Sequence, residues 1–233
     1  MVNEYSGQWF RTFLDPIPLE NTRAEVDGLA KHIPLPDFRR ILDVCCGPGR
    51  HMAELVARGY EVTGIDRDQA AVSRAHQRVP AATVLELDIR DLGTLEDEFD
   101  AALNLWASFG HFDAQTNDET LRHLHGLLRP DGRLLLDLFH PLGLRSYAGP
   151  EQVDDEKGTR TLTEPLPDNR WRVTIEYRSG DHDVFEWELF TPDQLSARAD
   201  KAGFDTLDMM TWWDPKRPPT AKELRFQAVL QRR

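Results

Sequence analysis

The chain has 233 residues, a length that fits one α/β domain, and its 40 acidic and 28 basic side chains give a formal net charge of −12. Because this charge repels phosphate backbones and the basic residues form no group larger than a pair, nucleic acid is not expected as a partner. The first ten residues lack the cationic stretch and apolar core of a signal peptide, and no apolar run approaches the ~20 residues of a membrane span, so neither secretion nor a membrane is expected.

The first part of the chain divides into an N-terminal leader, residues 1–38, and a segment in which strands and helices alternate, residues 39–140. In the leader, a helix is predicted from Asn21-Thr22 to Ala30, and the prolines at 34 and 36 end it. In the alternating segment, apolar strands and helical periodicity take turns, which is typical of a parallel sheet covered on both faces. Strands are predicted at 40–44, 61–65, 83–87, 99–105 and 134–139, with helices after Gly49 and at 69–78 and 119–128, and a turn at 129–132.

A different pattern follows Pro141. Apolar and polar residues alternate from Trp171 to Tyr177 and again from Phe185 to Leu189, which predicts an antiparallel hairpin within an insert at 141–190. Thr191 then caps a helix that ends at Gly203, and strands are expected at 204–210 and 224–230. The last segment, 191–233, therefore returns to the core.

The adjacent pair Cys45 and Cys46 provides the chain's only cysteines. Neighbouring residues on a strand point to opposite faces, so a disulfide between them would be strained. Reduced thiols indicate a cytoplasmic protein, and no metal site is expected because no metal-ligand spacing is present.

The segment from Ile41 to Arg50 reads as a strand, a tight glycine turn and a helix start. Gly47 and Gly49 match the first two glycines of a dinucleotide-binding turn, but Met52 occupies the third position. We expect Met52 to hold the helix away from the strand, and a phosphate-binding loop motif is also missing. The turn therefore approaches a ligand closely but suits a pyrophosphate poorly.

Asp66 and Asp88 lie at the ends of the next two predicted strands. A carboxylate at the first position accepts hydrogen bonds from a ribose diol, and one at the second accepts from the exocyclic amine of adenine. The alternative for both is a local role as a helix or turn cap.

These motifs, in this order, resemble those of the class I S-adenosylmethionine-dependent methyltransferases, of the small-molecule type in the methyltransferase-domain superfamily. The resemblance covers residues 40–140 closely, through the segments 42–50, 62–67, 88–92, 99–104 and 128–134, and extends loosely through 190–195 and 202–204. It implies a Rossmann-like, seven-stranded, mostly parallel sheet with helices on both faces, plus the antiparallel β insert after strand five. It also implies S-adenosyl-L-methionine as the cofactor.

The resemblance implies which residues bind each part of the cofactor. The methionine part is bound by Asp43, Cys45, Gly47, Gly49 and Arg50, although the family usually has glycine at the position of Cys45. The ribose belongs to Asp66, with Arg67 near the adenine, and Asp88 and Ile89 read the adenine. The sulfonium side belongs to Asn104, Leu105 and Trp106. A cationic ligand without phosphates fits this set of carboxylates independently of the resemblance.

A base is required only where the acceptor carries a proton, and the candidates are His111, His140 and Tyr147, after strands four and five. The alternative for each histidine is a bond to loop backbone. By the same resemblance, aromatic residues of the leader form a lid over the cofactor; the alternative is that they pack on the core. For the aromatic residues of the insert, three roles are open: a wall for the acceptor, the apolar face of the hairpin itself, or a dimer contact.

The expected function is methyl transfer from S-adenosyl-L-methionine to a small molecule at oxygen or nitrogen, by a monomer or a homodimer. The Asn/Asp-Pro-Pro-Tyr/Phe motif common in methylases of base and amide nitrogens is absent, since the matching stretch is Asn104-Leu105-Trp106-Ala107. Two alternatives remain: an S-adenosylmethionine-binding module without transferase activity, and an NAD-dependent oxidoreductase, which Met52 disfavours.

Overall fold

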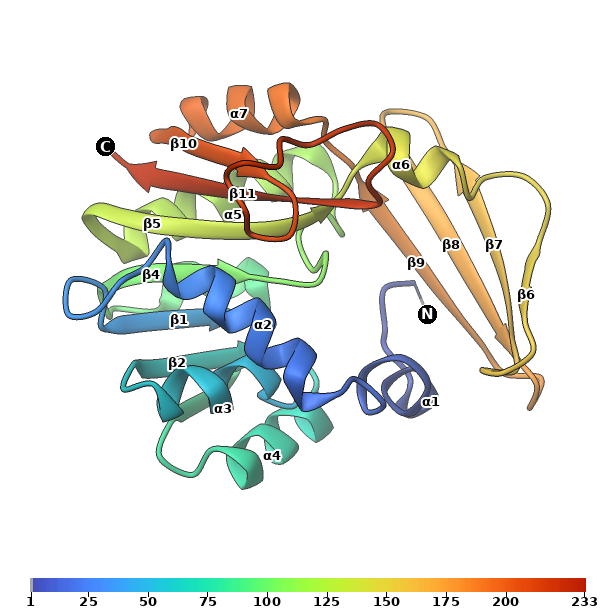
Figure 1. Ribbon diagram of the computed structural model, residues 1–233, viewed down its shortest axis with the longest axis horizontal. Helices are drawn as coiled ribbons and strands as arrows, with labels where there is room; N and C mark the ends of the chain where they lie inside the picture. The colour runs from blue at the N-terminus through green and yellow to red at the C-terminus, as the bar shows by residue number, and fades with distance from the viewer. Residues whose placement is uncertain (1) are drawn as a thin grey trace.

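The computed structural model describes residues 2–233 and contains two β-sheets (Figure 1). The larger sheet has seven strands in the order β10-β11-β5-β4-β1-β2-β3, and only β11 runs antiparallel to its neighbours. This confirms the predicted Rossmann-like, mostly parallel sheet. Its strands are β1 (Arg40–Val44), β2 (Glu61–Asp66), β3 (Thr83–Glu86), β4 (Phe99–Asn104), β5 (Leu128–Phe139), β10 (Phe204–Met210) and β11 (Arg225–Arg232).

Helices cover both faces of this sheet, with α2, α3 and α4 towards the viewer of Figure 1 and α5 behind. An apolar cluster on the near face includes Leu29, Met52 and Val72, and one on the far face includes Leu121 and Leu195. None of the helices in residues 2–233 has the length and apolar character that a membrane crossing requires. The helices are α1 (Gly7–Trp9), α2 (Leu19–Ala30), α3 (Arg50–Ala57), α4 (Gln69–Arg78), α5 (Ala114–Leu127), α6 (Pro141–Arg145) and α7 (Pro192–Lys201), with a π-helical turn at Phe10–Leu14 and a 3₁₀ helix at Ile89–Thr94.

Local capping explains where several helices begin. The predicted capping box of α7 is present, since Thr191 and Gln194 each accept from the other's backbone N–H. Two predicted starts are wrong: α2 begins at Leu19 rather than at Asn21, and α5 begins at Ala114 because the Asp113 side chain accepts from the Thr116 N–H. The turn predicted at 129–132 is instead a bulged part of β5.

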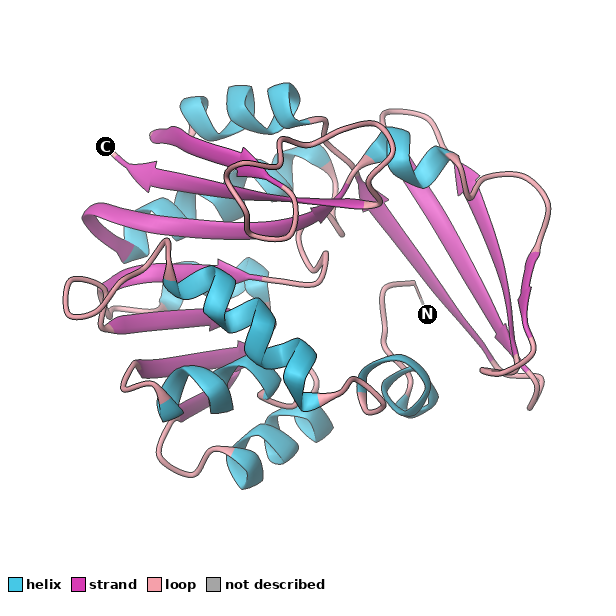
Figure 2. Cartoon of the chain, in the orientation of Figure 1, coloured by secondary structure: helices cyan, strands magenta, loops and turns pink. Residues whose placement is uncertain are grey.

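The smaller sheet is the antiparallel insert, with β6 (Gln152–Asp154), β7 (Thr159–Pro165), β8 (Arg170–Tyr177) and β9 (His182–Glu188). Figure 2 shows it beside the main sheet, with the short α1 helix between them. Its buried aromatic residues, such as Phe185 and Trp187, pack with Tyr5 and Trp9 of the leader. They therefore form the insert's own apolar face, which was one of the alternatives predicted.

Met52 does not hold α3 away from the sheet, contrary to the prediction. It is fully buried against β2, where Gly64 leaves room for its side chain. A Cβ atom at Gly64 would lie 2.5 Å from Met52 Sδ and 2.9 Å from Cys46 Sγ. A glycine on the neighbouring strand thus provides the close helix–sheet packing that a third glycine in the turn provides elsewhere.

Gly64→Ala should destabilise the fold by ~1–3 kcal/mol, because the added methyl overlaps Met52. Adding Met52→Ala should relieve that overlap, so the two losses should not sum. Urea unfolding of both single variants and the double variant measures this coupling. Strict additivity would contradict the assigned packing.

Candidate functional site

A pocket of about 520 Å³ lies at the carboxyl ends of β1, β2, β3 and β4, closed on one side by the leader. All its lining residues among those described fall between Asn3 and Phe112, so neither the insert nor the C-terminal segment forms its wall. Within residues 2–233, no cluster of His, Cys, Asp and Glu has the arrangement of a metal site. The lining includes these residues singled out from the sequence: Asp43, Cys45, Gly47, Arg50, Asp66, Arg67, Asp88, Ile89, Leu105, Trp106 and His111.

The turn between β1 and α3 contains three residues with positive φ: Cys45 (φ 61°), Gly47 (54°) and Gly49 (74°). Cys45 and Gly47 line the pocket, but Gly49, contrary to the prediction, does not and instead faces Ala75 of α4. The left-handed region is natural for glycine but costs a residue with a Cβ atom, so Cys45 is strained where a glycine was expected. Its side chain packs with the apolar cluster on the α5 side, while Cys46 packs on the opposite face.

Two aspartates from neighbouring strands converge behind this turn. Asp66 accepts from the Gly47 N–H (2.8 Å) and from the Asp68 N–H (2.9 Å), which fixes the carboxylate at the pocket wall. Asp43 is 2% exposed, and its Oδ2 has no hydrogen-bond partner among the described residues. Burial, followed by repulsion from Asp66, raises the pKa of Asp43 to about 7. An unpartnered buried carboxylate of this kind favours a cationic ligand group.

Arg50, at the first position of α3, supplies the complementary charge. Its Nη1 donates to Glu25 (2.6 Å) and Thr22 (2.8 Å), whereas its Nη2 is buried without a partner among residues 2–233. Arg50 and Asp43 both line the pocket, and each has one buried polar atom without a partner among residues 2–233: Nη2 in the arginine and Oδ2 in the aspartate.

Asp88 lines the pocket, but its carboxylate is engaged locally. Its Oδ1 accepts from both the backbone N–H and Nε of Arg90, at 2.9 Å each, and its Oδ2 accepts from Arg90 Nη2 (2.8 Å). These bonds lower the pKa of Asp88. It also caps the 3₁₀ helix that begins at Ile89, so the structure shows the capping role that was its alternative.

The end of β4 contributes Leu105 and Trp106 to the pocket but not Asn104. Asn104 is fully buried, and its Nδ2 donates to the Val44 carbonyl (3.2 Å). Trp106 has a φ of 59°, and the guanidinium groups of Arg50 and Arg225 lie 4.8 Å and 4.9 Å from the centroid of its ring. Cation–π contacts with two arginines therefore hold the indole beside the pocket.

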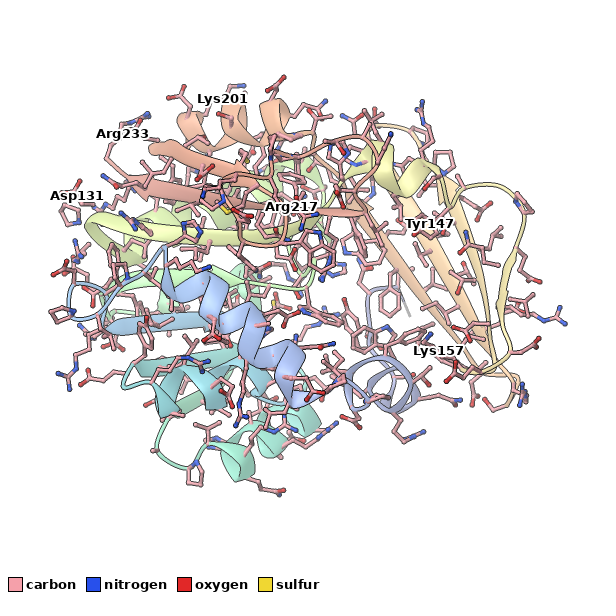
Figure 3. The ribbon with its side chains drawn as sticks, in the orientation of Figure 1. Asp131, Tyr147, Lys157, Lys201, Arg217 and Arg233 are labelled. Atoms are coloured by element: carbon pink, nitrogen blue, oxygen red, sulfur yellow. The ribbon has the colours of Figure 1, made fainter. Side chains whose placement is uncertain are left out.

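The three candidate bases separate in space. His111 lines the pocket, with its Nε2 3.3 Å from the Tyr5 hydroxyl, and burial lowers its pKa to about 3. The His140 ring is instead the N-cap of α6, accepting from the Leu142 and Gly143 N–H groups, which was its predicted alternative. Tyr147 is 41% exposed on the insert side of the molecule (Figure 3). Only His111 is therefore placed to meet a ligand in this pocket.

The leader lines the pocket with Tyr5, Trp9 and Phe10, and Asn3 connects the leader to its surroundings. The Asn3 N–H donates to the Val184 carbonyl of β9 (2.8 Å), its Nδ2 donates to the His111 carbonyl (3.0 Å), and its carbonyl accepts from Arg67. The insert therefore acts on the pocket indirectly, by supporting the leader.

Sequence reasoning missed Glu25, Asp137 and Arg225, which together brace Trp106 from behind the pocket. Asp137 Oδ2 accepts from the Trp106 N–H (3.1 Å) and from Arg225 (2.8 Å), and Glu25 accepts from the indole N–H (3.1 Å). No local motif marks these residues, because their shared neighbour is defined only by the fold.

Part of the chain is similar in sequence to known methyltransferases. Residues 41–132 match the protein family described as "Methyltransferase domain". The putative methyltransferase YqeM of Bacillus subtilis is 35% identical over 109 residues, which is 45% of this chain and 44% of that protein. Across three curated relatives that it matches, the aligned part of the chain spans 44% to 58% of their lengths.

Solved structures share the fold over nearly the whole chain. An S-adenosylmethionine-dependent methyltransferase from Clostridium acetobutylicum superposes with a TM-score of 0.79 at 12% identity, covering 96% of each chain. CalS10, an amino pentose methyltransferase from Micromonospora echinaspora, gives a TM-score of 0.70 at 21% identity, covering 100% of each chain. The main sheet and its insert thus form an architecture already known in other proteins.

The strain at Cys45 gives a test with its neighbour as the control. Cys45→Gly should leave the free energy of unfolding equal or raise it by up to ~1 kcal/mol, because glycine removes the left-handed penalty. Cys46→Gly, at a buried position without positive φ, should lose ~1–2 kcal/mol. Urea titration compares them, and an equal loss at both positions would argue against strain at Cys45.

Proposed function

Because the chain belongs to the class I S-adenosylmethionine-dependent methyltransferases, we propose that it binds S-adenosyl-L-methionine in this pocket and methylates a small molecule at nitrogen or oxygen. The observation that carries the proposal is that two residues lining the pocket, Asp43 and Arg50, each have a buried polar atom (Oδ2 and Nη2) without a partner among the described residues. The methionine part of the cofactor carries an ammonium and a carboxylate, which are the groups that would pair with these two atoms.

The rest of the pocket fits the adenosyl part. Each oxygen of Asp66 accepts one backbone N–H, which leaves lone pairs for a ribose diol. Ile89 and Leu87 give the pocket apolar surface beside Asp88, suited to a base. The grouping of Asp43, Asp66 and Asp88 would repel a pyrophosphate, so a dinucleotide fits this site less well.

When bound, the cofactor supplies an electrophilic methyl group, and the protein supplies orientation and exclusion of water. The leader excludes water by covering the pocket with Tyr5, Trp9 and Phe10. His111 remains neutral at physiological pH, since its pKa is about 3, and its imidazole can accept a hydrogen bond from the acceptor. The volume of about 520 Å³ is within the range of pockets that hold a small molecule.

Calorimetric titration with S-adenosyl-L-methionine and with NAD tests the ligand. We expect binding of the first and none of the second, and the reverse would overturn the proposal. Turnover with a panel of amines and phenols then separates an enzyme from a binding module. Cofactor binding without methylation of any panel member would favour the module.

Asp43→Asn should weaken S-adenosyl-L-methionine binding but stabilise the free protein above neutral pH. The pKa of Asp43 is raised from 3.8 to about 7, so the folded state binds a proton more tightly than the unfolded state. The stability that this group contributes is complete below the unfolded pKa and is lost as pH rises towards about 7. Thermal unfolding of both proteins should therefore show the variant gaining most at about pH 8 and least at about pH 4. A constant difference in Tm across this range would contradict the shifted pKa.

A further inference from the structure

We propose that Glu25, in helix α2 ahead of the core, is a positioning residue that orients Arg50 and Trp106 at the methionine end of the pocket. The inference rests on the proposed function, because it concerns how the chain holds that end of the cofactor. It gives α2 a role in the site, although Glu25 lies outside residues 41–132, which match the methyltransferase-domain family.

Glu25 contacts three pocket residues from two different elements. Its Oε2 accepts from Arg50 Nη1 (2.6 Å) and lies 2.9 Å from His51 Nε2, and its Oε1 accepts from Trp106 Nε1 (3.1 Å). Arg50 and His51 begin α3, whereas Trp106 follows β4. One carboxylate therefore sets the relative placement of two walls of the pocket.

The Glu25 carboxylate also sets which nitrogen of the Arg50 guanidinium is already engaged in hydrogen bonds. Glu25 and Thr22 occupy Nη1, and the Trp106 ring lies against the guanidinium at 4.8 Å. Nη2 is buried and has no partner among residues 2–233. Since a guanidinium is planar, fixing one nitrogen and one face fixes the direction of the other nitrogen.

The charge states of Glu25 and Arg50 support a stable ion pair between them. Burial opposes ionisation of Glu25, but hydrogen bonds and charge interactions with His51 and Arg50 outweigh it and lower its pKa to about 2. The side chains of Arg50 and Glu25 are only 10% and 24% exposed, so water screens the pair weakly. Asp137 holds Arg225 in a similar way (2.8 Å), and the Arg225 guanidinium lies 4.9 Å from the Trp106 ring centroid, so the ring contacts a second fixed arginine.

The test compares two ligands that differ in the part that Arg50 faces. S-adenosylhomocysteine has the adenosine, the sulfur and the amino-acid group, whereas 5′-methylthioadenosine lacks the amino-acid group. Glu25→Gln should weaken S-adenosylhomocysteine at least about tenfold, because a neutral amide cannot accept from all three donors. Its effect on 5′-methylthioadenosine should stay within about twofold. Calorimetry well below the Tm of each variant measures both affinities on folded protein.

A matched control lies on the same helix. Asp27 forms an exposed ion pair with Arg58 (2.7 Å), so Asp27→Asn removes a carboxylate from α2 without touching the pocket. It should change the affinity for S-adenosylhomocysteine by no more than about twofold. Glu25→Asp keeps the charge and should restore part of the affinity lost in Glu25→Gln.

A double-variant cycle identifies the route of the effect. If Glu25 acts through Arg50, adding Glu25→Gln to Arg50→Met should cost little beyond Arg50→Met alone. Equal weakening of both ligands by Glu25→Gln, or unchanged affinity for both, would overturn the inference while leaving the proposed function intact. If the unaltered protein fails to bind S-adenosylhomocysteine, the proposed function itself fails.

Discussion

The site depends on an unsatisfied charge. Asp43 lies on β1 in the middle of the main sheet, where a carboxylate is costly unless something pairs with it. Asp66 on the next strand increases that cost, and the nearby guanidinium of Arg50 relieves only part of it. A fold optimised only for stability would not place an unpaired carboxylate there. Its presence at the pocket wall is best explained by a cationic ligand that completes the arrangement.

The turn above Asp43 shows the same exchange of stability for access. Three residues with positive φ reverse the chain tightly, and two of them, Cys45 and Gly47, line the pocket. Gly64 on β2 leaves room for Met52, so helix α3 still packs closely on the sheet. The turn and this packing together place Arg50, the first residue of α3, in the lining of the pocket.

Sequence reasoning predicted the fold well because its signals are local and repetitive. Apolar runs predicted the strands, and the capping residue Thr191 predicted the start of α7. The starts of α2 and α5 were predicted too late, because Pro18 and Asp113 were not recognised as their N-cap residues. Most of the residues that the sequence predicted for the cofactor do line one pocket, because the carboxyl ends of parallel strands meet at one edge of the sheet. His140 and Tyr147 failed to reach that edge, since the chain turns away into the insert after β5. Glu25, Asp137 and Arg225 were beyond sequence reasoning, because only the tertiary fold makes them neighbours of Trp106.

A crystal structure with bound S-adenosylhomocysteine would show directly whether Asp43 and Arg50 hold the amino-acid end of the ligand. We expect the ligand's ammonium within hydrogen-bond distance of Asp43 Oδ2 and its carboxylate on Arg50 Nη2, with the ribose on Asp66. An amino-acid end directed away from Asp43 and Arg50, with those two atoms still unpaired, would contradict it.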